Sequence, residues 1–307
     1  MRRFLVLYNP GSGTDSGRAI AERFKEIVKG DNASHHVYLH SFDEKADKEP
    51  LREKAGANQI DTLVIVGGDG TIRHVVQTFR DCLADYKIGL LPGGTVNNFM
   101  RSLDLPLDIG EASRVILGDE TQAVDYGLVN GEVLISTLTI GILADTAADI
   151  TQKEKQKYGP FLFVKRFIDL LRKRKRYNLN VVTDETTWHG KSQLLSINMT
   201  HSVGGFTRYD RLARPDDGIL HMTIMPKLNI WELIRYSPQI LQGRLYELPQ
   251  IEYLTARSVR ITAQEINVGT RIDGDPSMDL PVEMEVVPRG LQILIKNKKA
   301  SFENSQN

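Results

Sequence analysis

The sequence predicts an α/β N-terminal domain, an open and mostly parallel sheet with helices on both faces, followed by a mainly antiparallel β-sandwich C-terminal domain. Two observations predict this. Strand-like apolar runs alternate with amphipathic helix-like segments up to about residue 123. Beyond it, strand-like runs follow one another closely and are separated by turns such as Asn130-Gly131. We therefore expect domains at residues 1–123 and 124–296 and a polar tail at 297–307.

The first domain should contain four short apolar strands, at residues 4–8, 36–41, 62–66 and 88–91. Helices are expected at residues 16–29, 51–58, 72–83, 98–103 and 111–117. In the first of these helices, Ile20, Phe24, Ile27 and Val28 fall on one face. Ligands of such sheets bind at the carboxyl ends of the strands, which is where glycine-rich turns occur in this chain.

The second domain should be built mainly of strands that pair with their neighbours. Two helices are expected to interrupt it, at residues 160–176 and 230–242. The strands are expected at residues 124–129, 133–140, 178–183, 194–199, 220–225, 258–263, 283–287 and 291–295.

Composition narrows the class of protein. The chain has 39 basic and 39 acidic residues, so no overall field attracts it to nucleic acid or membrane. Cys82 is the only cysteine, which excludes a disulfide within the chain and a cysteine-based zinc site. No apolar run reaches the roughly 18 residues that a membrane span needs. A cytoplasmic protein is expected.

Two glycine-rich turns carry the strongest functional signal. They are Gly67-Gly68-Asp69-Gly70-Thr71 and Gly93-Gly94-Thr95-Val96-Asn97, and each follows a predicted strand. Glycines let the backbone approach a ligand closely. The free N–H groups at the start of a following helix favour a bound phosphate. Two such turns at one sheet edge favour a nucleotide-phosphate site, although glycine also serves turn geometry alone.

The polar residues of these turns have two interpretations each. Asp69 beside a triphosphate would be repelled unless a divalent cation lay between them, so it is interpreted as a Mg²⁺-linked group. It could instead cap the next helix. Thr71 and Thr95 could donate to phosphate oxygens or cap helices. Asn97 could hold a phosphate or the adenine ribose, or act as a cap.

A third turn lies at the end of the first predicted strand and begins Asn9-Pro10-Gly11-Ser12-Gly13. It belongs to the same sheet edge as the other two turns. We therefore expect these five residues to line the nucleotide pocket. The alternative is an ordinary β-turn.

The motifs together resemble the diacylglycerol kinase catalytic-domain family, which includes soluble bacterial lipid kinases and, more distantly, the sphingosine kinases. The resemblance begins with Asn9-Pro10-x-Ser12-Gly13, Gly67-Gly68-Asp69-Gly70-Thr71 and Pro92-x-Gly94-Thr95-x-Asn97-x-Phe99. It continues in family order with Val124-Asp125-Tyr126-Gly127, Arg214-Pro215-Asp216-Asp217-Gly218-Ile219-Leu220 and Asp273-Gly274-Asp275. It implies ATP-dependent phosphorylation of a lipid hydroxyl, with the nucleotide between the two domains.

The resemblance also implies roles for single residues. Asp273 matches the general base that takes the proton of the attacking hydroxyl. Asp69 and Asp125 match the carboxylates that organise the catalytic Mg²⁺ through water. Asp217, with the backbone carbonyls of Arg214 and Ile219, matches a second, structural Mg²⁺ site. From the residues alone, Asp-Gly and Asp-Asp-Gly are also common turns between strands.

Five positions depart from the family pattern. Arg73 and His74 stand where an Asn-Glu pair is usual, and Asn98 stands where an aspartate is usual. Thr14 replaces a basic residue, and Asp275 replaces a glutamate. All five are expected near the phosphates or the metal. Together they could mean altered metal use, an altered substrate or lost catalysis.

The predicted helix at residues 160–176 is amphipathic and ends in five consecutive cations, Arg172-Lys173-Arg174-Lys175-Arg176. Such a helix suits transient contact with an anionic membrane surface, which would place the protein peripherally at the inner membrane face. The alternative is a helix packed on the sandwich with a solvated charged end. One short cluster in a neutral chain predicts no nucleic-acid partner, and a homodimer remains open.

The main functional hypothesis is a kinase that uses Mg²⁺ and ATP to phosphorylate a lipid alcohol such as diacylglycerol. An NAD kinase-like enzyme is the second hypothesis, because it shares the Gly-Gly-Asp-Gly-Thr turn. A catalytically impaired regulator that binds nucleotide or lipid is the third, motivated by Arg73, His74, Asn98 and Thr14.

Overall fold

The structure is a computed structural model that describes residues 1–9, 17–43, 48–141, 176–202, 209–226, 230–242 and 244–296. It divides into two compact units. The N-terminal unit comprises Met1–Tyr126 together with the chain from Pro288 onward, and the C-terminal unit comprises Gly127–Val287. The chain thus returns to its first unit at Pro288. The prediction placed one boundary near residue 123 and assigned residues 288–296 to the second domain. Residues 160–175 of the helix predicted at 160–176, the tail at 297–307 and residues 10–16 lie outside the described residues.

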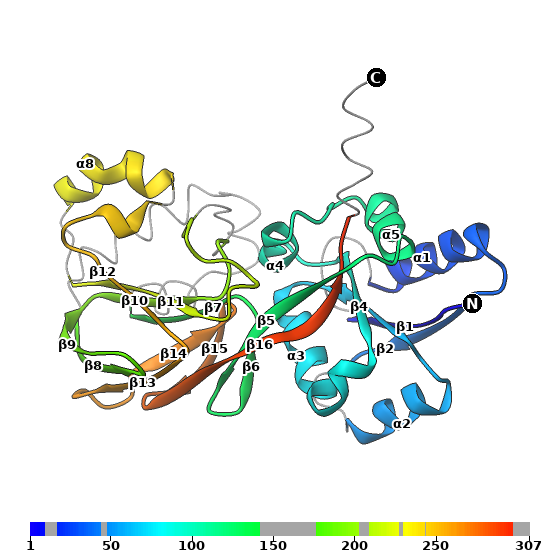
Figure 1. Cartoon of the computed structure of the whole chain (residues 1–307), viewed down its shortest axis with the longest axis horizontal. Coiled ribbons are helices and arrows are strands. Elements are labelled where there is room, and N and C mark those ends of the chain that lie inside the picture. Colours follow the sequence, from blue (N-terminus) through cyan, green and yellow to red (C-terminus); the bar gives the residue numbers. More distant parts are fainter. Residues whose placement is uncertain are drawn as a thin grey trace. The chain divides into compact units, whose positions relative to one another are not determined.

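The N-terminal unit contains the predicted parallel sheet (Figure 1). Its strands lie in the order β2 (His36–Ser41), β1 (Arg3–Tyr8), β3 (Thr62–Gly67) and β4 (Lys87–Pro92). The C-terminal residues of β16 (Val282–Leu294) pair parallel with β4. Helices α1 (Gly17–Asp31) and α5 (Ile109–Leu117) pack on one face, and α2 (Glu49–Ala57) lies on the other side. The remaining helices are α3 (Asp69–Phe79), the 3₁₀ helix η1 (Arg80–Asp85) and α4 (Asn98–Ser102).

The apolar stripe predicted on the first helix is buried against this sheet except at Ile27, which is partly exposed. Ile20, Phe24 and Val28 of α1 join one cluster with β1 and β3. Phe24 is fully buried and meets Phe4 edge to face, with 5.7 Å between the ring centroids. This contact fixes α1 on the sheet, and α1 follows directly after the turn that the sequence assigns to the nucleotide pocket.

The C-terminal unit is an antiparallel sandwich, so the predicted fold class is confirmed for both parts of the chain. One sheet has six strands. In spatial order these are β12 (Glu252–Ala256), β11 (Leu220–Met225), β10 (Leu194–Asn198), β7 (Thr137–Gly141), β14 (Gly269–Ile272) and β15 (Asp275–Asp279). The other sheet contains β16, β13 (Ser258–Ala263), β8 (Tyr177–Thr183) and β9 (Thr187–Ser192), with β5 (Thr121–Val129) and β6 (Glu132–Leu134) beside β16. Apolar side chains from both sheets form one core.

The face of the six-stranded sheet that points away from this core is also buried, but it is polar. Strand alternation sends Leu195 and Ile197 into the core and their neighbours to the other side. The buried polar residues on that side include Thr137, Ser196, Asn198, His221 and Thr223. Buried polar groups need hydrogen-bond partners, so this face holds a polar network, beside a small apolar cluster of Leu194, Met225, Leu248 and Ile251.

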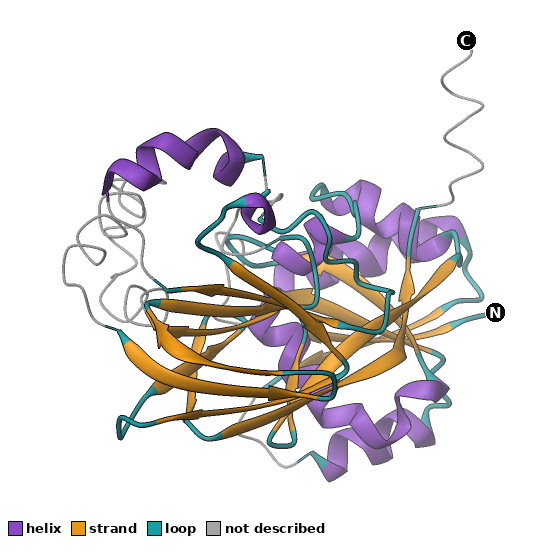
Figure 2. Ribbon diagram, turned by 60° about the vertical axis from the view of Figure 1, so that its left-hand side comes forward, coloured by secondary structure: helices purple, strands orange, loops and turns teal. Residues whose placement is uncertain are grey.

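Several strands differ from the sequence prediction. The strand predicted at 133–140 is interrupted between β6 and β7, and the strands predicted at 283–287 and 291–295 are the single strand β16. Strands β9, β12, β14 and β15 were not predicted. Helix α8 (Ile230–Leu241) lies within the predicted range 230–242, outside the strands of its unit (Figure 2).

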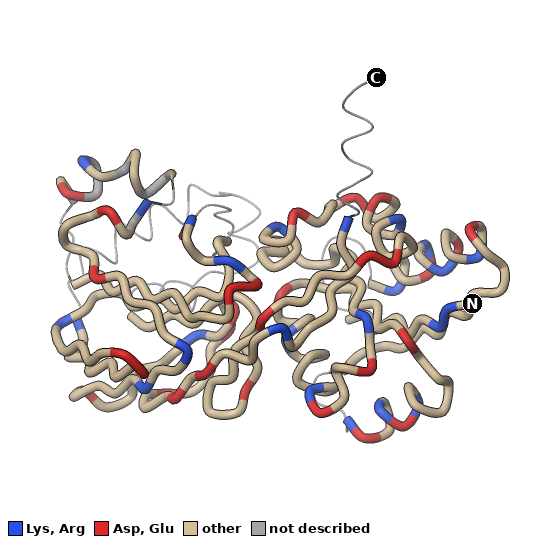
Figure 3. The backbone as a smooth tube through the Cα atoms, in the orientation of Figure 1, with Lys and Arg blue, Asp and Glu red and all other residues tan. Residues whose placement is uncertain are grey.

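Charges of both signs are interspersed along the helices of the N-terminal unit (Figure 3). This arrangement agrees with the zero formal net charge of the chain. In the part of the chain that the structure describes, no helix combines the length and the apolar character needed to span a membrane.

Replacing Phe24 by alanine should lower the free energy of unfolding by about 3–5 kcal/mol, because it leaves a cavity under α1. Urea unfolding followed by circular dichroism measures the change. Ile266→Ala is the matched control, since that side chain is 87 % exposed and should change stability little. Equal effects of the two substitutions would contradict the packing described here.

Candidate functional site

The three turns singled out in the sequence begin at the same edge of the parallel sheet. Tyr8, the last residue of β1, pairs with Val66 in β3, and Gly67 at the end of β3 pairs with Pro92 at the end of β4. The Asn9 amide donates to the Val66 carbonyl at 3.5 Å. The structure therefore brings Asn9 and the two glycine-rich turns together, while Pro10, Gly11, Ser12 and Gly13 lie outside the described residues.

The two glycine-rich turns pack backbone against backbone. A Cβ atom added to Gly94 would lie 2.5 Å from the Gly68 Cα, and one added to Gly68 would lie 3.1 Å from the Gly94 Cα. A Cβ on Gly93 would lie 2.8 Å from the Gly67 nitrogen. A side chain at Gly93 or Gly94 would force these backbones apart, and one at Gly68 would crowd Gly94, so the glycines let the two turns meet, whatever ligand binds there.

Asp69 is buried and its carboxylate joins the first turn to the helix after the second. Its Oδ2 accepts from the Asn98 amide at 2.9 Å, and its Oδ1 accepts from the Phe99 amide at 3.0 Å. These amides belong to the first turn of α4, where the helix itself provides no acceptors for them. Asp69 therefore has a capping role, but for α4 rather than for α3, in whose first turn it lies.

The second turn is closed by its own asparagine. Asn97 is buried, accepts from the Gly94 amide at 3.1 Å and donates to the Gly94 carbonyl at 3.0 Å. Its left-handed φ of 54° ends the turn at α4. The threonines differ: Thr95 is exposed, whereas Thr71 is buried against Gly67. Of the two threonine side chains, that of Thr95 is the one open to a ligand.

Asp125, also assigned to the N-terminal unit, is 2 % exposed in β5. Its Oδ1 accepts from the Arg289 amide at 2.7 Å. Arg289 has a left-handed φ of 54°, so this bond holds an irregular point in β16. The carboxylate thereby fixes the path of the last strand beside β5.

Asp273 belongs to the C-terminal unit and lies in the turn between β14 and β15, with a left-handed φ of 53°. Its Oδ1 accepts from the amides of Ser136, at 2.7 Å, and Thr137, at 3.0 Å. Its Oδ2 accepts from the Ile135 amide at 3.0 Å. Three backbone donors therefore orient the carboxylate that the resemblance gives as the general base, and they explain the break between β6 and β7.

Asp217 closes the Asp-Asp-Gly turn in the same unit. Its Oδ2 accepts from the Arg214 amide at 3.0 Å, and its Oδ1 accepts from the Ile219 amide at 3.2 Å. The imidazole Nε2 of His221 lies 2.9 Å from Oδ2. Arg214, Asp217 and Ile219 are thus one turn, as the resemblance requires, and the Mg²⁺ role of this turn stays a prediction.

Sequence reasoning missed the residues behind Asp217. The buried His221 and Asp210 and the partly buried Tyr253 form a polar group that reaches it. The available signal was the alternation of residues 194–198 and 220–225, which puts polar residues on one face of each strand. A hydrophobic sandwich was expected, so that face was not considered as a site.

The donor set suits a cation held mainly by phosphates and water. Among the described residues, no cluster of three or more His, Cys, Asp or Glu side chains could cage a metal. Mg²⁺ usually keeps several waters and binds one or two carboxylates and substrate phosphates. Asp69 and Asp125 are the buried carboxylates of the N-terminal unit to which the resemblance gives this role, and the role stays a prediction.

The departures from the family pattern occupy distinct environments. Arg73 is buried on α3, and its Nη2 lies 3.2 Å from the His74 Nε2. Asn98 supplies a backbone amide to Asp69, a role that does not depend on its side chain. Asp275 is exposed at the start of β15. Thr14 lies outside the described residues.

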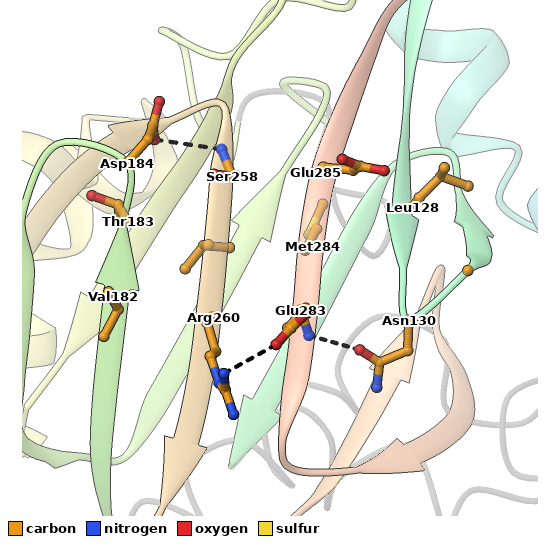
Figure 4. A pocket seen from close by; sticks show the side chains of 12 residues that line it. Leu128, Asn130, Val182, Thr183, Asp184, Ser258, Arg260, Glu283, Met284 and Glu285 are labelled. Carbon is orange, nitrogen blue, oxygen red and sulfur yellow. Dashed lines mark hydrogen bonds and ion pairs between the residues drawn. The ribbon is translucent and has the colours of Figure 1, made fainter.

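A cavity of about 460 Å³ lies elsewhere on the C-terminal unit (Figure 4). Strands β8, β13 and β16 and the β5–β6 turn line it, and Arg260 pairs there with Glu283 at 3.3 Å. None of the residues predicted for the site lines this cavity. The candidate site is therefore defined by the turns, not by this depression.

Comparison with known families supports the sequence motifs. Residues 3–129 match the model of the diacylglycerol kinase catalytic domain. Residues 137–295 match the model of the YegS C-terminal NAD kinase beta sandwich-like domain. The chain carries a diacylglycerol kinase catalytic domain followed by a YegS C-terminal domain, whose model spans more than half of it. The resemblance seen in the motifs is thereby confirmed, and the chain is an enzyme of a kinase family.

Individual relatives of this family align over nearly the whole chain. A diacylglycerol kinase of Staphylococcus epidermidis is 28 % identical over 295 residues, which cover 95 % of this chain and 92 % of that protein. A diacylglycerol kinase of Bacillus subtilis is 26 % identical over 303 residues, 98 % of each. A crystal structure of a diacylglycerol kinase from Bacillus anthracis has a TM-score of 0.76 at 20 % identity, over 97 % of this chain and 98 % of that chain. The last likeness confirms the fold.

In this family member, Gly94→Ala should lower the free energy of unfolding by about 1–3 kcal/mol, because the added Cβ meets the Gly68 backbone. It should also weaken the binding of ATP, measured by calorimetry, because the two turns would separate. Thermal unfolding and calorimetry on the same sample give both quantities.

Gly30→Ala serves as the control, because a Cβ there has no neighbour within 4 Å and lies in α1. It should stabilise the protein by about 0.5–1 kcal/mol through helix propensity and leave ATP binding unchanged. If Gly30→Ala lowered the free energy of unfolding as much as Gly94→Ala, the contact between the two glycine-rich turns would not explain the effect of Gly94→Ala.

Proposed function

We propose that the protein transfers the γ-phosphoryl group of ATP to the hydroxyl of a lipid alcohol such as diacylglycerol. The observation that supports this most is the junction of the two glycine-rich turns at the carboxyl edge of the parallel sheet. Backbone amides, the exposed Thr95 and the buried Asp69 are gathered there. In a member of a kinase family, this edge is the natural place for nucleotide phosphates.

The reaction needs a base and a charge-neutralising ion. The lipid hydroxyl oxygen forms a bond to the γ-phosphorus, the bond from that phosphorus to the bridging oxygen breaks, and ADP leaves. Asp273 accepts the hydroxyl proton in our proposal, from a carboxylate that three backbone amides already orient. Bound Mg²⁺ would neutralise phosphate charge, and Asp69 and Asp125 are the residues that would hold its waters.

A lipid acceptor lies in a membrane, so the enzyme must bind it at the membrane surface. We propose that residues 160–176, with their five consecutive cations, make transient contact with an anionic leaflet at the inner membrane face of the cell. The relatives named above are diacylglycerol kinases, which supports a lipid acceptor.

An NAD kinase-like activity is the second candidate. The family model that matches residues 137–295 describes a domain similar to the NAD kinase β-sandwich, and this observation favours including NAD among the tested acceptors. The turn at Asp217 and the second glycine-rich turn, which resemble the lipid kinases, support the lipid acceptor instead.

The decisive experiment follows transfer of radiolabelled γ-phosphate from Mg²⁺-ATP to diacylglycerol, other lipid alcohols and a total lipid extract in mixed micelles, with NAD as a separate acceptor. A labelled lipid is the expected product. Label on NAD would favour the second candidate. Binding of ATP with no label on any acceptor would support an impaired regulator.

Asp273→Asn should lower kcat by roughly 10²–10⁴-fold because it removes the base. The KM for ATP should stay close to that of the wild type. The amide group must also present an NH₂ to one of the three backbone donors, so the free energy of unfolding should fall by about 1–3 kcal/mol. Steady-state kinetics and urea unfolding measure the two effects. A variant with the kcat of the wild type would remove Asp273 from the mechanism.

The predicted cation site at the Asp217 turn has its own test. Millimolar Mg²⁺ should raise the melting temperature of the wild type more than that of Asp217→Asn, because a ligand that binds only the folded state stabilises it. Asp184→Asn is the control, since its carboxylate also accepts backbone amides, at a turn with no predicted metal. Equal Mg²⁺ effects in all three proteins would mean that the turn holds no cation and that the His221 contact takes its place.

A further inference from the structure

A continuous chain of hydrogen-bonded side chains crosses the polar face of the six-stranded sheet. It begins at the backbone cradle of Asp273 and ends at Asp217. All of its members belong to the C-terminal unit. The chain runs through Thr137 (β7), Asn198 (β10), Asp210, Tyr253 (β12) and His221 (β11).

Thr137 connects this chain to Asp273. Its backbone amide donates to the Asp273 Oδ1 at 3.0 Å, and its backbone carbonyl accepts from the Asp273 amide at 2.8 Å. Its hydroxyl lies 2.8 Å from the Asn198 Oδ1 and 3.0 Å from the Ile197 carbonyl. The residue that orients the predicted base is therefore itself held through its side chain.

Asn198 is fully buried, and its surroundings fix which way its amide points. The Nδ2 group faces the Asp210 Oδ2 at 3.4 Å, where a donor is required, and the Oδ1 atom faces the Thr137 hydroxyl. A reversed amide would place its oxygen against a carboxylate. Asn198 therefore fixes the direction in which the hydrogen bonds of this network are donated.

Tyr253 supplies the next connection. Its hydroxyl lies 3.1 and 3.0 Å from the two Asp210 oxygens and 2.8 Å from the His221 Nδ1. Burial raises the pKa of Tyr253, and the Asp210 carboxylate raises it further, so the phenol keeps its proton and donates it to Asp210. Both ring nitrogens of His221 then face an accepting oxygen, Nδ1 the phenol oxygen and Nε2 the Asp217 Oδ2 at 2.9 Å, so both contacts are hydrogen bonds when the imidazole carries both protons.

We propose that Thr137, Asn198, Asp210 and Tyr253 are positioning residues that hold Asp273 in its orientation and connect it to the Asp217 turn. The proposal rests on the function given above for Asp273. It adds that the orientation of Asp273 depends on a network that spans four strands, and not only on the hairpin in which Asp273 lies.

Packing alone does not explain this network. An apolar face would fill the same space without the cost of burying Asp210, Asn198 and His221, and such replacements are often neutral or stabilising. What the polar chain adds is direction, because a hydrogen bond holds its donor and its acceptor at a defined distance and angle. Catalytic groups need such orientation from the residues behind them.

The test compares two substitutions at one position. Thr137→Val keeps the backbone amide and the shape but removes the hydroxyl, whereas Thr137→Ser keeps the hydroxyl. Thr137→Val should lower kcat by roughly 10- to 100-fold with an unchanged KM for ATP, as misplaced reacting groups do. Thr137→Ser should restore most of the kcat.

Thr223→Val is the matched control on the same buried face. The Thr223 hydroxyl has no hydrogen-bond partner among the described residues, so its loss should leave kcat unchanged. Tyr253→Phe interrupts the chain at a second point and should lower kcat in the same way. Combined with Thr137→Val it should add little, because residues of one network act as a unit.

A readout independent of activity separates this proposal from the proposed function. Hydrogen exchange at the Ser136 and Thr137 amides should be faster in Thr137→Val and Tyr253→Phe than in the wild type, and unchanged in Thr223→Val. If the wild type showed no lipid kinase activity but the two variants still exchanged faster than the wild type, the proposed function would be rejected and the network would be kept. If Tyr253→Phe had the same exchange rates and the same kcat as the wild type, the positioning role would be overturned. This outcome can be measured even if Thr137→Val fails to fold.

Discussion

Hydrogen bonds from backbone amides to aspartate carboxylates hold the turns on which the rest of the structure depends. A buried N–H group without an acceptor is costly, and the tight turns of this chain leave several of them. Asp69 accepts from backbone amides at the start of α4, and Asp125 accepts from the amide of Arg289 in β16. Asp273 accepts from the amides between β6 and β7. Each bond joins segments far apart in the sequence, so these carboxylates fix the path of the chain at the predicted site.

The same atoms therefore serve structure and proposed chemistry. In the sequence, a cap and a metal-linked carboxylate were alternatives for Asp69, and a turn and a base were alternatives for Asp273. The structure shows that both residues have the structural role, which does not exclude the other one. A carboxylate oriented by backbone donors is preorganised, and preorganisation is what electrostatic catalysis requires. The structural bonds are thus part of the argument for function.

The sequence predicted the parallel part of the fold almost completely, because β1, β3 and β4 are buried on both faces and its helices carry clear apolar stripes. It missed features that depend on distant partners. The break after β6 exists because Asp273, more than 130 residues later, binds the amides there. Strand β16 continues past residue 287 because Asp125 holds its irregular point. Strand β9 was missed because it is a polar edge strand with little apolar periodicity. The site turns were found from glycine and aspartate alone, whereas the network behind Asp217 has no local motif.

The glycines of the site carry less functional information than their motif suggests. Gly68 and Gly94 are required because the two turns touch through their backbones, and that contact is needed for folding with or without a nucleotide. A relative that had lost catalysis would keep them. The exposed Thr95 and the left-handed Asp273 are different, because neither is required by a contact between two backbones. A left-handed turn position would be less strained with glycine, and the three amides beside it need an acceptor in that one place. Evidence for catalysis in this chain therefore rests more on Asp273 and the residues that hold it than on the glycine-rich turns that first reveal the family.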